Sequence, residues 1–317
     1  MNVRIAVDLF GGDSGSSVCL PGCINALKRD KNLKITALVS RLIDVTRFKK
    51  IDRLEYAYAD SVVDMDENPL KVMRSKKNST MGHGLGLVKD SVADAFLTAG
   101  NTGALIALGH CILGAENKKQ RSAIMTTLPS KSRDVYLLDS GANADCSPEM
   151  LHQFACYAAQ YIGMSKNPSV GLLNIGHEAS KGNSLVRDAA KLIQSDKTLN
   201  FFGFVEPQDV FNGQVDIVVC DGFSGNVFLK TVEATSEYVM HKQIKLFDKS
   251  FVARFMMSYL KAAIQKLKQR YSRSKYTYGV VLGLNGQVYK AHGSVKQSVF
   301  TESILHIASH IRQSKTI

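Results

Sequence analysis

The sequence of 317 residues has no tryptophan, only six prolines and six cysteines. The cysteines form no Cys-x-x-Cys pair and the eight histidines form no recognisable metal-ligand pattern, so neither a disulfide framework nor a zinc module is expected. No apolar run is long enough to cross a bilayer, and the N-terminus lacks a signal-peptide pattern. We therefore expect a cytoplasmic globular protein with reduced cysteines and no metal or cofactor.

Nucleotide-binding loops are also missing. Gly11 and Gly12 follow the first strand pattern, but the third glycine of a dinucleotide fingerprint is not at its place and no ribose-binding acid follows convincingly. A Walker-type phosphate loop is absent as well.

What the chain does have is positive charge, with a formal net charge of +12. Seven lysines, three arginines and one aspartate between residues 241 and 275 account for +9 of it. This basic segment is interleaved with Phe, Met, Leu and Ile, and no nucleic-acid motif accompanies it. An anionic membrane surface or an acidic protein partner therefore fits better than nucleic acid.

The hydrophobic pattern alternates between strands and helices along most of the chain, which is typical of a parallel sheet. Strand patterns occur at 3–9, 34–39, 54–59, 94–100, 135–138, 170–173, 199–205 and 217–219, and helical patterns at 18–28, 41–50, 69–75 and 104–113. The fold class predicted is α/β with a mostly parallel sheet.

Three parts of the chain are distinguished. Residues 1–235 form the α/β body, and 236–275 form a basic amphipathic helical hairpin inserted into it, with helices at about 227–245 and 251–270. Residues 276–317 complete the body with a strand hairpin across Asn285-Gly286 and a closing helix. The inserted hairpin is apolar around much of its circumference, so we expect it to contact a second subunit, a membrane interface, or both.

The segment 216–226 is the first candidate site. A β-branched run ends at Asp221-Gly222, where a helix begins that Ser224 or Asn226 can cap. Gly222 and Gly225 would allow close approach to a ligand, and the free N–H groups of the first turn would attract an anion. An ordinary strand–helix loop with a packing glycine explains the segment equally well.

Polar residues recur after four strand patterns, near Asn101, Asp139, Asn174 and Asp221. If the sheet is parallel, these loops converge at one edge of it. Lys181 is the only cation among them, and the asparagines and loop amides are hydrogen-bond donors. The set predicts a ligand that is an oxygen-rich anion such as phosphate.

Six segments resemble the bacterial phosphate acyltransferase (PlsX) family, in that family's order. They are Asp8-Leu-Phe-Gly-Gly-Asp13, Ala99-Gly-Asn-Thr-Gly-Ala-Leu105, Leu138-Asp-Ser-Gly-Ala-Asn-Ala-Asp-Cys146, Leu172-Leu-Asn-Ile-Gly-His-Glu-Ala-Ser-Lys-Gly182, Cys220-Asp-Gly-Phe-Ser-Gly-Asn-Val-Phe-Leu-Lys230, and Leu282-Gly-Leu-Asn-Gly286 with His292-Gly293. The sequence departs from the family where Phe10 replaces the usual Met, His177 the usual Glu and Val280 a small residue.

The resemblance implies a three-layer α/β/α sandwich like the isocitrate and isopropylmalate dehydrogenases, a homodimer, and peripheral attachment to the inner face of the membrane. It also implies the reaction, in which a long-chain acyl group passes from acyl-[acyl-carrier-protein] to orthophosphate to give acyl phosphate for phospholipid synthesis. No cofactor is implied.

Phosphate is largely dianionic at neutral pH, so positioning and charge stabilisation should matter more than a general base. We assign catalysis to Lys181, for phosphate charge and the oxyanion, and to Asn226 as a donor. Asp139, Asp145 and Asp221 are expected to orient lysines and amides, because carboxylates facing phosphate would repel it. The remaining expected substrate-binding residues are Asn101, Thr102, Gly103, Asn143, Asn174, Glu178, Asp221, Gly222, Gly225 and His292.

Three alternatives remain. Cys146 or Cys220 could accept the acyl group covalently, although neither has an obvious histidine partner and packed thiols are favoured. A metal- and NAD-dependent hydroxyacid dehydrogenase would share the fold class but needs a dinucleotide loop that is not recognisable here. A non-enzymatic membrane scaffold would not need so many polar strand ends.

Overall fold

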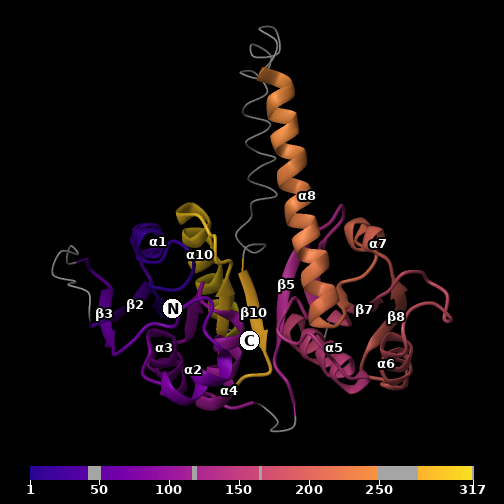
Figure 1. The fold of residues 1–317 in the computed structure, drawn as a ribbon, viewed down its shortest axis with the longest axis horizontal. Helices are drawn as coiled ribbons and strands as arrows, with labels where there is room; N and C mark the ends of the chain where they lie inside the picture. Colours follow the sequence, from indigo (N-terminus) through magenta and orange to yellow (C-terminus); the bar gives the residue numbers. More distant parts are fainter. Residues whose placement is uncertain (42–50, 116–119, 164–165, 249–277, 316–317) are drawn as a thin grey trace.

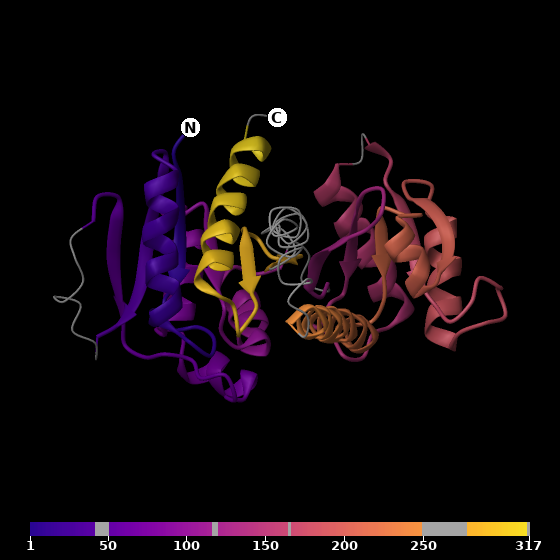
Figure 2. The same cartoon turned by 90° about the horizontal axis from the view of Figure 1, so that it is seen from above.

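A computed structural model describes residues 1–41, 51–115, 120–163, 166–248 and 278–315. It contains one sheet of 11 strands in the order β3-β2-β1-β4-β11-β10-β5-β6-β9-β7-β8. The sheet continues through two halves that lie side by side, with the long helix α8 (Gly222–Asp248) rising between them (Figures 1 and 2). The predicted second helix at 251–270 lies outside the described residues, as does the helical pattern at 41–50.

The first half combines the beginning and the end of the described chain. Its strands are β1 (Val3–Asp8), β2 (Leu33–Ser40), β3 (Leu54–Ala59), β4 (Ala95–Thr98), β10 (Tyr278–Leu282) and β11 (Val288–Ala291). Its helices are α1 (Ser16–Arg29), α2 (Pro69–Ser75), α3 (Thr80–Lys89), α4 (Thr102–Ile112) and α10 (Gln297–Ser314). Helices α1 and α10 pack on one face of the sheet, and α2, α3 and α4 pack on the other.

The second half is continuous from β5 to α8. Its strands are β5 (Ala123–Pro129), β6 (Asp134–Leu138), β7 (Ser169–Leu173), β8 (Asn200–Val205) and β9 (Ile217–Val219). Helices α5 (Pro148–Ile162) and α6 (Ser184–Ser195) cover one face, and α7 (Pro207–Asn212) and the start of α8 cover the other. Both halves are therefore three-layered, and the predicted α/β class with a mostly parallel sheet is confirmed.

Several helices begin at a side chain that accepts a hydrogen bond from the first turn, as the local sequence dictates. Pro follows two of these caps at the first helical position, where its missing N–H costs nothing. The capping residues are Asn68 for α2, Ser79 for α3, Asn101 for α4, Ser147 for α5 and Asn183 for α6.

Strand direction changes at the centre of the sheet. β10 is antiparallel to both of its neighbours, β11 and β5, and β5 is antiparallel to β6. Consequently β6, β9, β7 and β8 run opposite to β1, β2, β3, β4 and β11. The expectation that all four polar loops follow parallel strands at one edge is wrong for Asn101, which follows β4 in the first half.

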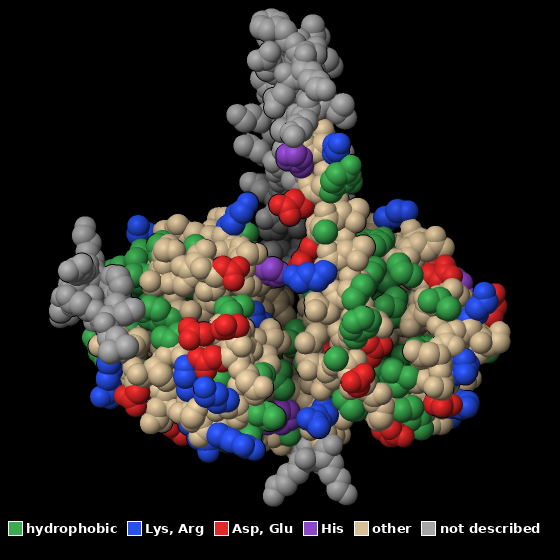
Figure 3. Space-filling view, viewed as in Figure 1, with side chains coloured by type: hydrophobic (Ala, Val, Ile, Leu, Met, Phe, Trp, Pro, Cys, Tyr) green, Lys and Arg blue, Asp and Glu red, His purple; other side chains and the backbone are tan. Residues whose placement is uncertain are grey.

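α8 extends away from the body, and hydrophobic side chains gather around its base on the face shown in Figure 3. It is one continuous helix through residue 235, where the sequence analysis placed a domain boundary. Among the described residues, no helix is both long and apolar enough to cross a bilayer.

Candidate active site between the two halves

A cavity of about 760 Å³ lies between the halves and takes its walls from both. The first half contributes the end of β11 and the start of α4, and the second half contributes β5, the loop after β6 and the first turns of α8. Its polar lining residues are Asp13, Thr102, Thr126, Ser140, Asn226, Lys230, Glu233, Glu237, Tyr278, Lys290, His292, Ser294 and Lys296. Thr102, Asn226 and His292 are thus the predicted site residues that line this cavity.

Asp139 holds the loop after β6 in place. Its fully buried carboxylate accepts hydrogen bonds from the backbone N–H groups of Ile124 at 3.0 Å, Gly141 at 3.1 Å and Asn143 at 2.7 Å. The side-chain amide of Asn143 adds a bond of 2.9 Å to the same carboxylate. Asp139 therefore orients amides, as the sequence analysis expected, and Asn143 supports the loop without lining the cavity.

The start of α8 packs directly on this loop. A Cβ atom on Gly222 would lie 2.5 Å from the Asn143 carbonyl oxygen, and one on Gly225 would lie 2.0 Å from the Asp139 carbonyl oxygen. Both obstacles are backbone atoms, so only glycine permits this contact. The packing places Asn226 beside Gly141, where a Cβ on that glycine would be 3.4 Å from the amide carbon of Asn226.

The anion cradle expected from the amides of the first turn of α8 is not observed. The N–H of Gly222 donates to the Asn143 carbonyl at 2.8 Å, that of Ser224 to the Asp221 carboxylate at 2.8 Å, and that of Gly225 to the Asp221 carbonyl at 2.9 Å. Asp221 caps the helix and the two glycines permit close helix packing, so all three have structural roles here, and their contact with a ligand stays a prediction.

Asn101 and Gly103 also act within the protein. The amide oxygen of Asn101 caps α4 through Ala104, while its nitrogen donates to the carbonyls of Met65 and Glu67, both at 2.9 Å. A Cβ on Gly103 would lie 2.6 Å from Pro69, so this glycine permits contact between α4 and α2. These residues position Thr102 at the cavity, and neither lines it.

The 174–182 loop does not reach the cavity in this structure. Asn174 is buried and its side chain donates to the carbonyl of Gly176 at 3.0 Å, which shapes the loop. Lys181 has half of its side chain exposed and lies 3.9 Å from Glu178. Neither Lys181 nor Glu178 lines the cavity with Asn226, so the catalytic role of Lys181 stays a prediction.

His177, where the family usually has an acid, ties the same loop to α7. Its Nε2 donates to a carboxylate oxygen of Asp209 at 2.7 Å. Asp209 is buried and also accepts from the backbone N–H of Glu206 at 2.8 Å. The hydrogen bond to Asp209 raises the pKa of His177 and so favours its protonated form on the loop that carries Lys181.

Lys290 is the functional candidate that the sequence analysis missed. It lies on β11 and lines the cavity with only 9% of its surface exposed. Its Nζ donates to the carbonyls of Ala99 at 3.2 Å and Ala291 at 2.5 Å. Burial lowers the pKa of Lys290 to about 8, with Lys230 acting in the same direction.

No carboxylate lies within ion-pair distance of Lys290 among the described residues, although the more distant charge of Asp13 favours its ammonium form. A buried lysine without an acidic partner is costly and marks a place where an anion is expected to bind. The sequence signal was a lysine inside the otherwise apolar run Val288–Ala291, directly before His292-Gly293.

Lys230, Glu233 and His292 form a second charged group at the cavity. Lys230 Nζ lies 2.5 Å from Nε2 of His292 and 2.9 Å from a carboxylate oxygen of Glu233. The neighbouring His292, whose Nε2 lies 3.6 Å from the Glu233 carboxylate, and after it Lys230 lower the pKa of Glu233 to about 2. Lys230 is therefore already paired, which leaves Lys290 as the better candidate for contact with an anionic substrate.

The two thiols considered for covalent catalysis are unsuited to it. Burial raises the pKa of Cys146 to about 12 and that of Cys220 well above its ordinary value. Cys220 is 3% exposed, and neither thiol lines the cavity. Since the thiolate is the nucleophile, the packed-thiol interpretation is supported.

The chain matches the fatty acid synthesis protein family over residues 3–316. A curated phosphate acyltransferase from Nitrosococcus oceani is 39% identical over 312 residues, which cover 96% of this chain and 92% of the relative. The chain therefore belongs to the fatty acid synthesis protein family. It is an enzyme of the phosphate acyltransferase type, in agreement with the resemblance found in the sequence.

Solved structures share the fold at low sequence identity. A phosphotransacetylase from Streptococcus pyogenes superposes with a TM-score of 0.60 at 17% identity, covering 98% of this chain and 94% of that one. A putative 4-hydroxythreonine-4-phosphate dehydrogenase from Salmonella typhimurium gives a TM-score of 0.53 at 13% identity, covering 98% and 100%. The fold is thus found in proteins with transferase and dehydrogenase names, and the function must be argued from the site.

Proposed function

We propose that this enzyme transfers a long-chain acyl group from acyl-[acyl-carrier-protein] to orthophosphate, and that the cavity between the halves is where the transfer occurs. The observation that carries the proposal is Lys290, a buried ammonium group with no carboxylate within ion-pair distance among the described residues, in the cavity whose second-half wall holds Asn226. The family match and the identity to curated phosphate acyltransferases support the same reaction.

The chemistry requires phosphate and a thioester in contact. A phosphate oxygen attacks the thioester carbon to give a tetrahedral oxyanion, which collapses as the C–S bond breaks and the carrier's thiolate leaves. Phosphate is already ionised, so no strong base is needed, and the enzyme's contribution is positioning and charge stabilisation. Lys290 would balance phosphate charge, and the Asn226 amide would donate to phosphate or the oxyanion.

Lys181 would contribute positive charge from the 174–182 loop of the second half. Because it does not line the cavity, its proposed role requires the 174–182 loop to move toward bound substrate. The loop's own hydrogen bonds from Asn174, at 3.0 and 3.5 Å, would travel with it, since they join residues within the loop. The His177–Asp209 bond links the loop to α7 and would have to adjust.

The direct test is an assay of the purified protein with acyl-[acyl-carrier-protein] and phosphate. Acyl phosphate, identified directly by mass spectrometry, should form together with free carrier protein, and only when phosphate is present. Release of carrier protein at the same rate without phosphate would indicate a thioesterase and contradict the proposal. Oxidation of a hydroxyacid with NAD would favour the dehydrogenase alternative.

Attachment to an anionic membrane and assembly as a homodimer are further parts of the proposal. Exposed apolar side chains follow one face of α8 at helical spacing, including Phe223, Val227 and Tyr238. A stripe of exposed apolar side chains on a helix that extends from the body supports the presence of a partner, a second subunit or a membrane, that covers it. The basic segment 241–275 supports an anionic surface, although most of it lies outside the described residues. Sedimentation would test assembly as a homodimer, and flotation with vesicles would test attachment to an anionic membrane.

A further inference from the structure

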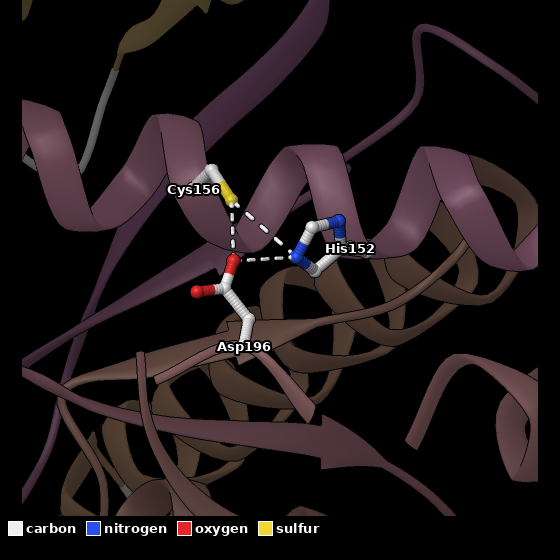
Figure 4. A group of neighbouring side chains, drawn as sticks. All are labelled: His152, Cys156 and Asp196. Carbon is white, nitrogen blue, oxygen red and sulfur yellow. Dashed lines mark hydrogen bonds and ion pairs between the residues drawn. The ribbon is translucent and has the colours of Figure 1, made fainter. Parts of the chain in front are cut away.

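Three side chains with metal-binding atoms meet on the helices that cover one face of the second half, and none of them lines the cavity. His152 and Cys156 are one turn apart on α5, and Asp196 directly follows α6 (Figure 4). Nε2 of His152 lies 2.8 Å from Oδ2 of Asp196. Sγ of Cys156 lies 3.8 Å from that nitrogen and 3.9 Å from that oxygen. The three atoms therefore converge on one point.

The surrounding structure fixes this arrangement. His152 and Cys156 are four residues apart, so they project from the same face of α5. The other carboxylate oxygen of Asp196 accepts from the backbone N–H of Thr198 at 2.9 Å and from its hydroxyl at 2.7 Å. Asp196 is thereby oriented by its neighbours, with one oxygen left for the cluster. The side chains of His152 and Asp196 are 31% and 21% exposed, so an ion can reach the cluster from solvent.

A nucleophilic Cys-His-Asp triad does not fit these contacts. In such a triad the carboxylate binds one ring nitrogen and the thiol faces the other. Here the same nitrogen, Nε2 of His152, faces both Asp196 and Cys156. Burial and the neighbouring Asp196 raise the pKa of Cys156 to about 11, which leaves little thiolate at neutral pH.

We propose that His152, Cys156 and Asp196 bind a zinc ion, with a fourth coordination position open to water. Zinc bonds of about 2.0–2.2 Å to nitrogen and oxygen and about 2.3 Å to sulfur separate tetrahedral ligand atoms by roughly 3.3–3.6 Å. The observed separations differ from these by about half an ångström or less, so rotation of side chains suffices. The thiol selects zinc over magnesium or calcium, which prefer oxygen ligands.

Zinc binding would cross-link α5 to the end of α6. The thiol must lose its proton to become a ligand, and the imidazole must turn its lone pair at Nε2 toward the metal, keeping its proton on Nδ1. Below the thiol pKa, the zinc affinity should therefore rise about tenfold per pH unit through this proton alone. The ion neutralises the thiolate and the carboxylate together. The site does not depend on the proposed acyl transfer.

The test uses the full-length protein, freed of metal with a chelator. Zinc is titrated in competition with a chromophoric chelator, and Co²⁺ is used as a spectroscopic probe. We expect one equivalent to bind, with a near-ultraviolet thiolate-to-Co²⁺ absorption band and a raised melting temperature. Cys156→Ser should abolish that band, and His152→Gln should weaken zinc binding by at least about 100-fold.

Cys111→Ser is the matched control, because Cys111 is an exposed free thiol outside the cluster. It should leave stoichiometry, absorption band and affinity unchanged. Loss of the band in this control and its retention in Cys156→Ser would overturn the proposal. The proposal would also be overturned if the unaltered protein failed to bind one zinc ion with sub-millimolar affinity. Circular dichroism of each variant separates loss of metal binding from loss of folding.

Discussion

Asp139 shows how one buried carboxylate can shape a loop that borders the candidate active site. It is fully buried and receives several backbone N–H groups from β5 and from its own loop. In Asp139→Asn, an amide NH₂ would face those donors, so we expect the free energy of unfolding to fall by about 1–3 kcal/mol. Urea unfolding measures the loss.

Acyl transfer should fall in the same variant, because Ser140 and Gly141 line the cavity. Asp145→Asn is the matched control, because the orienting role expected of Asp145 is not observed: its carboxylate accepts no hydrogen bond among the described residues. Equal stability of the Asp139 variant and the unaltered enzyme would contradict this account of the loop.

Lys290 gives a prediction for the pH dependence of activity. If its ammonium form binds phosphate, kcat/KM for phosphate should decline as the pH rises through about 8, the pKa of Lys290 in the free enzyme. Lys290→Met should lose most of kcat/KM and this pH dependence, whereas Lys290→Arg should retain charge and shift the decline upward. A Met variant with normal phosphate saturation would exclude the role.

Lys290 should also make protein stability depend on pH, with stability rising over the pH range in which activity declines. The pKa of Lys290 is lower in the folded protein than its ordinary value of 10.5, so the unfolded chain binds more protons between pH 8 and 10.5. The free energy of unfolding should therefore rise with pH in this window, by up to roughly 3 kcal/mol from this group. Comparing unaltered enzyme with Lys290→Met by urea unfolding at pH 7.5 and 9.5 isolates the effect.

The sequence identified the polar loops but not the internal contacts of their side chains. Asn101, Asn174 and Asp221 cap helices or hold turns, and a sequence does not distinguish such residues from ligand-binding ones. Lys290 was missed because its strand pattern shows burial but not that the buried face borders a cavity.

At the scale of elements, the start of α8 is the part whose position the site depends on most. Asp221→Ala removes the cap and should destabilise the protein by about 1 kcal/mol. It should also reduce kcat, because Asn226 stands on the following turn. Asn caps a helix nearly as well as Asp, so Asp221→Asn should preserve both stability and kcat. If Asp221→Asn and Asp221→Ala had equal defects, the charge of Asp221 would matter rather than its capping.

The other described strands and helices α1, α2, α4, α8 and α10 were predicted from periodicity, but strand β5 and helices α3, α5, α6 and α7 were not. For α3 there is a local reason. Its residues Gly82, Gly84 and Gly86 argue against a helix by propensity. The structure explains Gly84, since a Cβ there would lie 2.2 Å from the ring of Phe96. Packing of α3 on the sheet thus overrides propensity, and only the fold reveals that partner.

At the scale of the whole molecule, the α/β class followed from the alternating pattern, whereas the reversal of strand direction did not. Hydrophobic periodicity reports which faces are buried but not which way a neighbouring strand runs. The hairpin across Asn285-Gly286 was recognised, yet its insertion between β4 and β5 depends on long-range pairing.

The overall charge gives a prediction about the protein substrate. An acidic carrier protein approaching a chain with a net charge of +12 should associate faster at low salt. We expect kcat/KM for acyl-[acyl-carrier-protein] to fall at least several-fold between about 0.05 and 0.5 M salt, while a small neutral acyl thioester shows little change. Equal salt responses for the two donors would exclude electrostatic steering by the basic segment.

The late position of β10 and β11 in the chain has a consequence for biosynthesis. Until residues 278–291 leave the ribosome, β4 and β5 each lack the neighbour that joins the two halves, and both expose unpaired edges. Lys290 and His292 arrive with the same segment. A nascent chain that stops short of it therefore lacks both the strands that join the halves and the proposed substrate-binding residues, so we expect it to be inactive.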